Sequence, residues 1–238
     1  MKEIMDIERV NGYLRQFDLE HLFSEPLRKH LALYQFEPDE TLCLQGEEPQ
    51  FLFFLVSGKV KVFTTSTEGR TLLINFTTPL GIIGEIECLR DRVNLNTVKA
   101  VSPVETIGIH KRWLSQYGVE APFLRFLLDM VTDKFYTKSL ALSSNLLNSV
   151  EVRLASYLLS VSFDDEKESY SSVRISSIKD TANLIGTSYR HLNRVLRSFS
   201  SAGLVERRKG ILVVIDRKGL TEVAGRNIYE SSERRKGL

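Results

Sequence analysis

The sequence has few cysteines and prolines and no long apolar run. Its 238 residues include only 2 Cys, 6 Pro and 14 Gly, which excludes collagen-like, disordered and disulfide-scaffold proteins. Cys43 and Cys88 are too far apart to suggest a metal cluster. No segment approaches the ~18 apolar residues that span a bilayer, and the start, MKEIMDIERV, lacks the apolar core of an export signal. We therefore expect a cytoplasmic protein with no membrane contact.

Charge is distributed unevenly along the chain. The net charge is only +2, but residues 174–238 carry 14 Lys and Arg against 6 Asp and Glu, a net of +8. The first 173 residues carry 18 against 24, a net of −6. This split predicts two domains, of which the smaller prefers a polyanion. A basic tail that serves only solubility is the alternative.

Residues 31–109 consist of short apolar segments separated by turn residues. Lys59 to Phe63 alternates polar and apolar side chains, as a half-buried strand does. Turn signals such as Pro38-Asp39 and Ser57-Gly58 recur at roughly ten-residue intervals. The pattern predicts a double-stranded β-helix or jelly roll over residues 1–118, entered through a short helical segment.

Residues 121–147 have helical periodicity, with no Gly and with Pro122 only near the start. At about 1.5 Å per residue this helix would be near 40 Å long. Alternating steps of four and three, typical of a coiled-coil seam, join Leu124, Leu128, Val131, Phe135, Lys138, Leu142 and Asn145. Five of these residues are apolar, and the polar Lys138 and Asn145 interrupt the second half of the seam. We predict a dimerisation helix and hinge over residues 119–148 and hence a homodimer. A helix packed wholly on its own domain is the alternative.

The chain after a further helix, Val150 to Phe163, predicts a DNA-binding motif. Ser177 precedes a short helix, Ile178 to Leu184, and Ser188 precedes a second, Tyr189 to Ser200, with Gly186 at the turn between them. A basic turn between two apolar segments then predicts a hairpin. Together these elements predict an α+β chain of two domains, with a C-terminal winged helix-turn-helix over residues 149–238.

This order of elements resembles the Crp–Fnr superfamily of bacterial transcription regulators over nearly the whole chain. The most specific pieces are Gln45-Gly46-Glu47, the strand Phe51 to Phe63 with Gly58, Ile83-Gly84-Glu85, and the helix-turn-helix from Ile178 to Arg197. Within the superfamily the chain is most similar to the YeiL-like branch. The resemblance implies a homodimer on an inverted-repeat operator in double-stranded DNA, with recognition helices roughly 34 Å apart. RNA polymerase would be a further partner if the protein activates transcription.

The resemblance also implies which residues meet DNA. Tyr189, Arg190 and Arg194 take the positions that face base edges, and Arg194 is the expected guanine reader because the family keeps an arginine there. Arg190 could grip phosphate instead. The phosphate candidates are Ser177, Lys179, Ser188, Arg197, Arg207, Arg208 and Lys209. For each of these a solvated surface residue is the alternative.

The effector pocket departs from the family pattern. In cyclic-AMP-binding members, the glutamate at the position of Glu85, after Gly84, holds a ribose hydroxyl, and an Arg-Ser pair holds the cyclic phosphate. Here that pair is replaced by Asn94 and Leu95, while Arg92 lies two places early. Without the guanidinium no fixed charge offsets a buried phosphate. We therefore predict a regulator that does not depend on cyclic AMP.

The base-capping positions of those relatives align with Lys138 and Ser139. If a pocket persists there, Lys138 would favour an anionic or carbonyl-bearing effector. We predict no cofactor and no metal, and leave open a small-molecule effector whose identity the sequence does not give.

Two other function classes are possible for a chain with a β-roll. Metal enzymes on β-rolls need two or three histidines with a carboxylate, yet Leu31 to Ile109 contains no His, only His110 adjoins it, and no hydrolase motif occurs. We therefore predict that the protein is not an enzyme. The second rival, a nucleotide-type sensor that signals through a protein partner, leaves the winged helix without a purpose.

Overall fold

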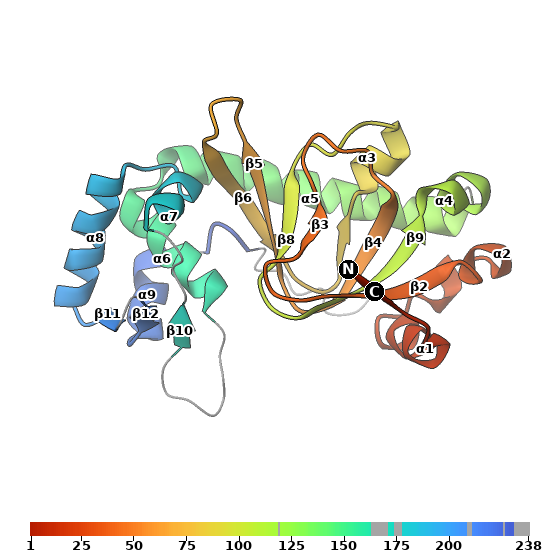
Figure 1. Cartoon of the computed structure of the whole chain (residues 1–238), viewed down its shortest axis with the longest axis horizontal. Coiled ribbons are helices and arrows are strands. Elements are labelled where there is room, and N and C mark those ends of the chain that lie inside the picture. Colours follow the sequence, from red (N-terminus) through yellow and green to blue (C-terminus); the bar gives the residue numbers. More distant parts are fainter. Residues whose placement is uncertain (119, 163–170, 174–177, 209–210, 226, 231–238) are drawn as a thin grey trace. The chain divides into compact units, whose positions relative to one another are not determined.

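The computed structural model describes residues 1–118, 120–162, 171–173, 178–208, 211–225 and 227–230 (Figure 1). The chain divides into two compact units, Met1–Thr64 with Phe76–Tyr136, and Thr65–Asn75 with Thr137–Leu238. Strands dominate the first unit and helices dominate the second. The architecture is the predicted α+β arrangement of a β-roll, a long helix and a C-terminal helix-turn-helix with a small sheet.

Two sheets build the β-roll. The five-stranded sheet has the order β1 (Lys2–Ile4), β2 (Leu31–Phe36), β9 (Val104–His110), β4 (Phe51–Ser57) and β7 (Gly81–Ile83). The four-stranded sheet has the order β3 (Thr41–Cys43), β8 (Thr97–Ala100), β5 (Val60–Thr65) and β6 (Thr71–Thr77). Strands distant in sequence pair antiparallel, as β2 with β9 and β5 with β8.

Strand β4 is apolar from Phe51 to Val56, and side chains on both of its faces are buried. Successive side chains of a strand point to opposite faces of the sheet. Phe53 and Leu55 pack into the cluster between the two sheets, whereas Leu52, Phe54 and Val56 pack into the cluster beneath the helices. Each such buried side chain contributes about 1.5–3 kcal/mol relative to exposure. The five-stranded sheet therefore forms the middle layer of the first unit.

The stretch Phe51 to Phe63 contains two strands, β4 and β5, which are separated at the predicted turn of Ser57 and Gly58. Gly58 has φ +85°, and a Cβ there would lie 2.2 Å from the carbonyl oxygen of Pro103. The turn at Gly58 leads the chain from β4 in one sheet to β5 in the other. A glycine is needed at this point because any other residue would be strained at this positive φ, and its Cβ would clash with Pro103.

Helices cover the outer face of the five-stranded sheet. They are α1 (Ile7–Gln16), η1 (Glu20–Leu22), α2 (Glu25–Arg28), α3 (Glu85–Arg90), α4 (Lys111–Tyr117) and α5 (Ala121–Leu147). The helix α5 has the predicted bounds, and its Phe123, Phe126, Leu127 and Met130 are buried in the same cluster beneath the helices as Leu52 and Phe54 of β4. One face of the first half of α5 thus packs on the first unit.

The second unit packs its helices around a three-stranded sheet. Its elements are α6 (Val150–Val161), β10 (Ser171–Val173), α7 (Ile178–Leu184), α8 (Tyr189–Ser201), β11 (Val205–Arg208), β12 (Ile211–Val214) and α9 (Arg217–Ala224). The sheet order is β10-β12-β11, and β11 and β12 form the predicted hairpin. The helix α6 ends at Val161, earlier than the predicted Phe163, because the chain becomes extended at Ser162. The sequence did not predict α9 or β10.

Candidate nucleic-acid interface and effector pocket

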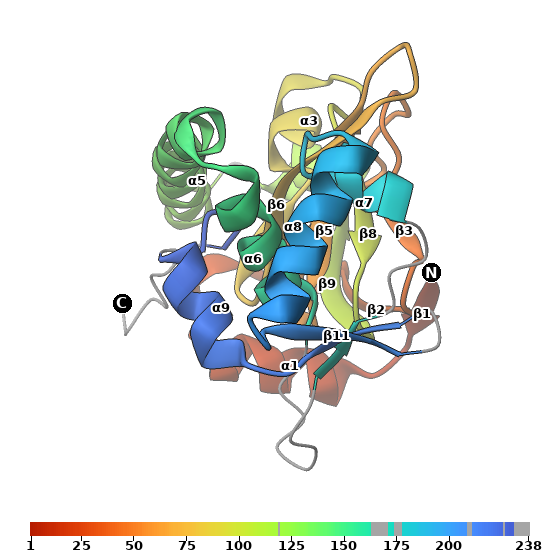
Figure 2. The same cartoon turned by 90° about the vertical axis from the view of Figure 1, so that its left-hand side faces the viewer.

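The recognition helix α8 turns one face inward and one outward. Its buried residues are Leu192, Val195, Leu196 and Phe199. The hydroxyl of Ser188 accepts the backbone N–H of His191 at 3.2 Å, so Ser188 caps α8 as predicted. Figure 2 shows α8 along its length, with α7 at its N-terminal end. The packing of the inward face fixes which side chains point to solvent.

The outward face of α8 carries a line of arginines. Arg190, Arg194 and Arg197 are exposed and follow one another at steps of four and three, so they lie on one side of the helix. Tyr189 is 54% exposed in the first turn. Guanidinium groups bind phosphate oxygens and the edge of guanine. This arginine stripe can therefore contact a nucleic acid.

Most of the remaining phosphate candidates are also exposed. Lys179 lies on α7, and Arg207 and Arg208 lie on β11. Ser177 and Lys209 lie outside the described residues. The predicted cations thus come from three elements of one unit.

The turn of the helix-turn-helix is braced by an arginine of α6. Arg153 donates from Nη1 to the carbonyl oxygens of Ile185 at 2.7 Å and Gly186 at 3.1 Å. Carbonyl groups at a helix C-terminus have no intrahelical donor, and a guanidinium is a strong substitute. The turn before α8 is therefore held partly by a side chain from outside the motif.

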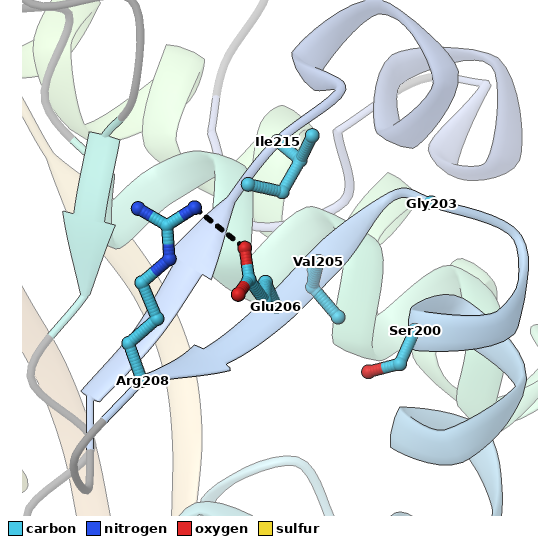
Figure 3. Close-up of a pocket in the computed structure, with 6 residues that line it drawn as sticks. All are labelled: Ser200, Gly203, Val205, Glu206, Arg208 and Ile215. Carbon is cyan, nitrogen blue, oxygen red and sulfur yellow. Dashed lines mark hydrogen bonds and ion pairs between the residues drawn. The ribbon is translucent and has the colours of Figure 1, made fainter.

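The hairpin contains an ion pair on strand β11. Arg208 Nη2 lies 2.6 Å from Glu206 Oε2, and this hydrogen bond lowers the pKa of Glu206 (Figure 3). The two residues line a small pocket together with Ser200, Gly203, Val205 and Ile215. Glu206 would compete with a phosphate for Arg208, whereas Arg207 has no ionic partner among the described residues.

In the first unit, the expected effector carboxylate is buried and paired. Glu85 is 3% exposed at the start of α3. Lys134 of α5 donates from Nζ to Glu85 Oε1 and to the carbonyl oxygen of Ile82, both at 2.6 Å. Gly84 before it has φ +84°, and a Cβ there would lie 2.9 Å from the carbonyl oxygen of Phe51. The carboxylate is thus satisfied by the chain itself.

The other predicted pocket residues of this region, Arg92, Asn94 and Leu95, make no hydrogen bond to Glu85 among the described residues. Asn94 is 5% exposed and holds a neighbouring loop, with its backbone N–H bound to Glu47 O at 2.8 Å and Nδ2 to Leu44 O at 3.2 Å. Leu95 is 56% exposed, and Arg92 is exposed too. Among the described residues, none of these three is bonded to the carboxylate at the start of α3.

The predicted seam of α5 is largely uncovered within the chain. Leu124, Leu128 and Phe135 are 43%, 64% and 72% exposed, and Val131 is half-buried. Three large apolar side chains along one face of a helix form a surface that another chain can cover. Leu142 belongs to the part of α5 whose side chains are not described.

Lys134 was not among the predicted pocket residues; from the same helix the sequence indicated Lys138 and Ser139, at the base-capping positions. Ser139 is exposed, and the side chain of Lys138 is not described. The missed signal was the buried face of α5, since Phe123, Leu127 and Met130 follow at steps of four and three and the next position, four residues on, is Lys134. Arg153 was missed because its partners lie in a turn more than thirty residues away.

The described residues contain neither a candidate metal cluster nor a helix that could span a membrane. No three His, Cys, Asp or Glu side chains gather in a way that could hold a metal ion. No described helix combines the length and apolarity needed to cross a membrane.

Two family models match the chain, one in each unit. The model of a cyclic nucleotide-binding domain matches residues 33–117, and the model of a Crp-like helix-turn-helix domain matches residues 152–223. The chain belongs to the Crp/Fnr family. As a Crp/Fnr protein it is a DNA-binding transcription regulator with an effector domain, and not an enzyme.

Individual Crp/Fnr proteins resemble the chain over most of its length. The regulatory protein YeiL of Escherichia coli O157:H7 is 28% identical over 193 residues, 81% of this chain and 85% of YeiL. A CRP-like cAMP-activated global transcriptional regulator of Mycobacterium tuberculosis is 21% identical over 202 residues, 83% and 90% of the two chains.

Solved structures of Crp/Fnr proteins share the fold. TTHB099, a CRP-family transcriptional regulator of Thermus thermophilus, matches with a TM-score of 0.66 at 21% identity, over 82% of this chain and 98% of that one. The c-di-GMP responsive regulator CLP of Xanthomonas campestris matches with a TM-score of 0.63 at 18% identity, over 87% and 99%.

Proposed function

We propose that this regulator is a homodimer that recognises an inverted-repeat operator through α8 without requiring cyclic AMP. The observation that carries the proposal is the arginine stripe, which lies on a helix whose opposite face is buried. Arg194 reads guanine through a bidentate contact, and Arg197, Lys179 and Arg207 bind phosphate. Such a regulator would act in the cytoplasm, with RNA polymerase as a further partner if it activates transcription.

The DNA-binding proposal is tested by selecting duplexes from a random pool with the full chain. The wild type should enrich an inverted repeat, and its affinity should fall steeply between about 50 and 200 mM salt as counterions are released. Arg194→Ala should lose about 1–3 kcal/mol of discrimination against a base-substituted repeat. Arg197→Ala is the matched control, since a lost phosphate contact weakens all duplexes alike. A wild-type chain that enriches no sequence contradicts the proposal.

The exposed seam of α5 supports the dimer. Leu128 and Phe135 are mostly exposed in the single chain, and a partner α5 would remove both from water. Leu128→Glu should therefore shift the sedimentation equilibrium toward monomer. Met5→Glu places the same charge at a residue that is 97% exposed and should leave the dimer unchanged. A wild-type chain that sediments as a monomer contradicts this part.

The pocket supports independence from cyclic AMP, because its residues do not fit a cyclic phosphate. Glu85 is already bound by Lys134 at 2.6 Å, so a ribose hydroxyl would have to displace an ammonium group. Asn94 and Leu95, which stand where the resemblance places the phosphate-binding pair, carry no charge, and a buried phosphate needs one.

Operator affinity measured with and without cyclic AMP decides this point. We expect the same dissociation constant at saturating cyclic AMP, and a large rise in affinity would contradict the proposal. The match to a cyclic nucleotide-binding domain at residues 33–117 favours a second candidate, a nucleotide sensor that signals through a protein partner. Calorimetric binding of cyclic AMP or c-di-GMP without any change in operator affinity would support that candidate.

A further inference from the structure

One side chain of the arginine stripe has a partner on its own helix. Arg194 Nη2 lies 2.9 Å from Nε2 of His191, which precedes it by three residues on α8. Side chains at this spacing are neighbours on a helix surface. Within the described chain, neither Arg190 nor Arg197 has a comparable side-chain partner.

The donor sets the direction of this hydrogen bond. A guanidinium is always protonated and offers only donors, so Nε2 of His191 accepts from Arg194. Only one of the N–H groups of Arg194 is used in this contact, and the others stay available for a guanine edge.

Glu151 of α6 provides a carboxylate near His191 and Arg194. Glu151 lies in the first turn of α6, which packs against α8. Hydrogen bonds from its own backbone N–H and from Ser149 lower the pKa of Glu151, and its electrostatic attraction to Arg194 lowers it further. Glu151 is thus ionised at neutral pH, and its negative charge favours a cation at Arg194.

We propose that His191 positions Arg194 for base recognition and so determines the sequence specificity of this regulator. The inference rests on the proposed role of Arg194 at base edges. An arginine side chain has many rotamers, and ordering them on DNA opposes binding. The hydrogen bond to His191 restricts Arg194 before DNA arrives, and Glu151 adds an electrostatic restraint from the neighbouring helix.

The test compares two substitutions of the same residue. For each full-length variant, the specificity ratio is the dissociation constant for a scrambled duplex divided by that for the repeat selected by the wild type. His191→Leu removes the acceptor and should lower this ratio about fivefold, while affinity for the scrambled duplex stays within about twofold. His191→Gln supplies an amide oxygen as acceptor and should keep the ratio within about twofold of wild type.

A double-mutant cycle separates positioning from a direct contact. In the Arg194→Ala background, His191→Leu should have no further effect on the ratio, because the side chain that it positions is gone. A further fivefold loss there would mean that His191 acts independently of Arg194, and would overturn the inference.

Other outcomes distinguish this inference from the proposed function. If Arg194→Ala lowers the ratio and His191→Leu does not, the role of His191 is wrong and the proposed function stands. Equal losses in His191→Leu and His191→Gln, with wild-type melting curves, would also overturn the inference, because the acceptor would then be irrelevant. If the wild type selects no repeat, the proposed function fails and the inference fails with it. Glu151→Gln should also lower the specificity ratio, but less than His191→Leu does, and this result would support the inference.

Discussion

The two units differ in where their charged side chains find partners. In the first unit, Glu85 and Glu105 face inward and are bound by side chains of the same unit. In the second unit, Arg190, Arg194 and Arg197 face solvent on one side of α8. A buried charge must be paired within the protein, whereas an exposed row of cations favours an external anion. The two carboxylates of the first unit thus have their partners within the chain, whereas the arginines of α8 remain open to an external anion.

The strongest test of the first half of this comparison is Lys134→Ala. It leaves Glu85 buried without its cation, which should destabilise the unit by about 3 kcal/mol. Fluorescence of Trp113, the single tryptophan of the chain, reports unfolding of the first unit during a urea titration.

Two controls accompany Lys134→Ala. Lys61 pairs with Asp39, which is 84% exposed, at 3.6 Å, so Lys61→Ala should cost at most about 1 kcal/mol. The double variant Glu85→Gln with Lys134→Met removes both charges and should recover most of the loss. If Lys134→Ala unfolds at the same urea concentration as wild type, the buried pair does not stabilise the unit.

The next largest effect is expected from Arg153, which points inward although it belongs to the cationic unit. Arg153→Ala removes charge-assisted hydrogen bonds to Ile185 and Gly186 and should destabilise the second unit by about 2 kcal/mol. Far-ultraviolet circular dichroism would show an earlier transition. Trp113 fluorescence serves as the internal control, because it lies in the first unit and should keep its midpoint.

Glu105 gives a smaller, pH-dependent test. Burial alone would raise its pKa, but hydrogen bonds from Gln35 at 2.6 Å, from Tyr13 at 2.7 Å and from Arg9 outweigh burial, and the pKa is lowered. A carboxyl whose folded pKa lies below its unfolded value contributes stability above the unfolded pKa, about 4.3, and loses it as pH falls through the folded pKa.

The measurement is the midpoint of thermal unfolding, followed by Trp113 fluorescence between about pH 3 and pH 7. The wild type should lose stability in the acidic part of this range, and Glu105→Gln should lose less there because it has no carboxyl group to protonate at that position. Parallel curves for the two proteins would contradict the role of Glu105.

Features set by local sequence were predictable, and features set by distant contacts were not. The bounds of α5 followed from an uninterrupted helical stretch, and the start of α8 followed from its Ser188 cap. Strand β1 has three residues, Lys2–Ile4, too few to show alternation, and is defined by pairing with β2. The pair of Glu85 and Lys134 joins residues 49 positions apart, and no spacing rule reaches that far.

The helix α9 shows a different reason for failure. It spans Arg217–Ala224 and contains Gly219, which lowers helix propensity by about 1 kcal/mol relative to alanine. Tertiary packing against α6 compensates, since α9 and α6 lie against each other. Local propensity alone therefore underestimated this helix.

The smallest expected effect concerns Arg207, which is exposed on β11. If the exposed cations of the second unit bind an external anion and do not stabilise the fold, Arg207→Ala should change the free energy of unfolding by no more than about 0.5 kcal/mol. It should weaken selected and scrambled duplexes alike and reduce the slope of log affinity against log salt by about 1. Arg208→Ala on the same strand should change the slope less, because Glu206 already holds that guanidinium at 2.6 Å. Equal slopes for the two variants would show that the ion pair of Arg208 and Glu206 opens on DNA. A charge paired within the chain would then also bind an external ligand, which would contradict the difference drawn between the two units.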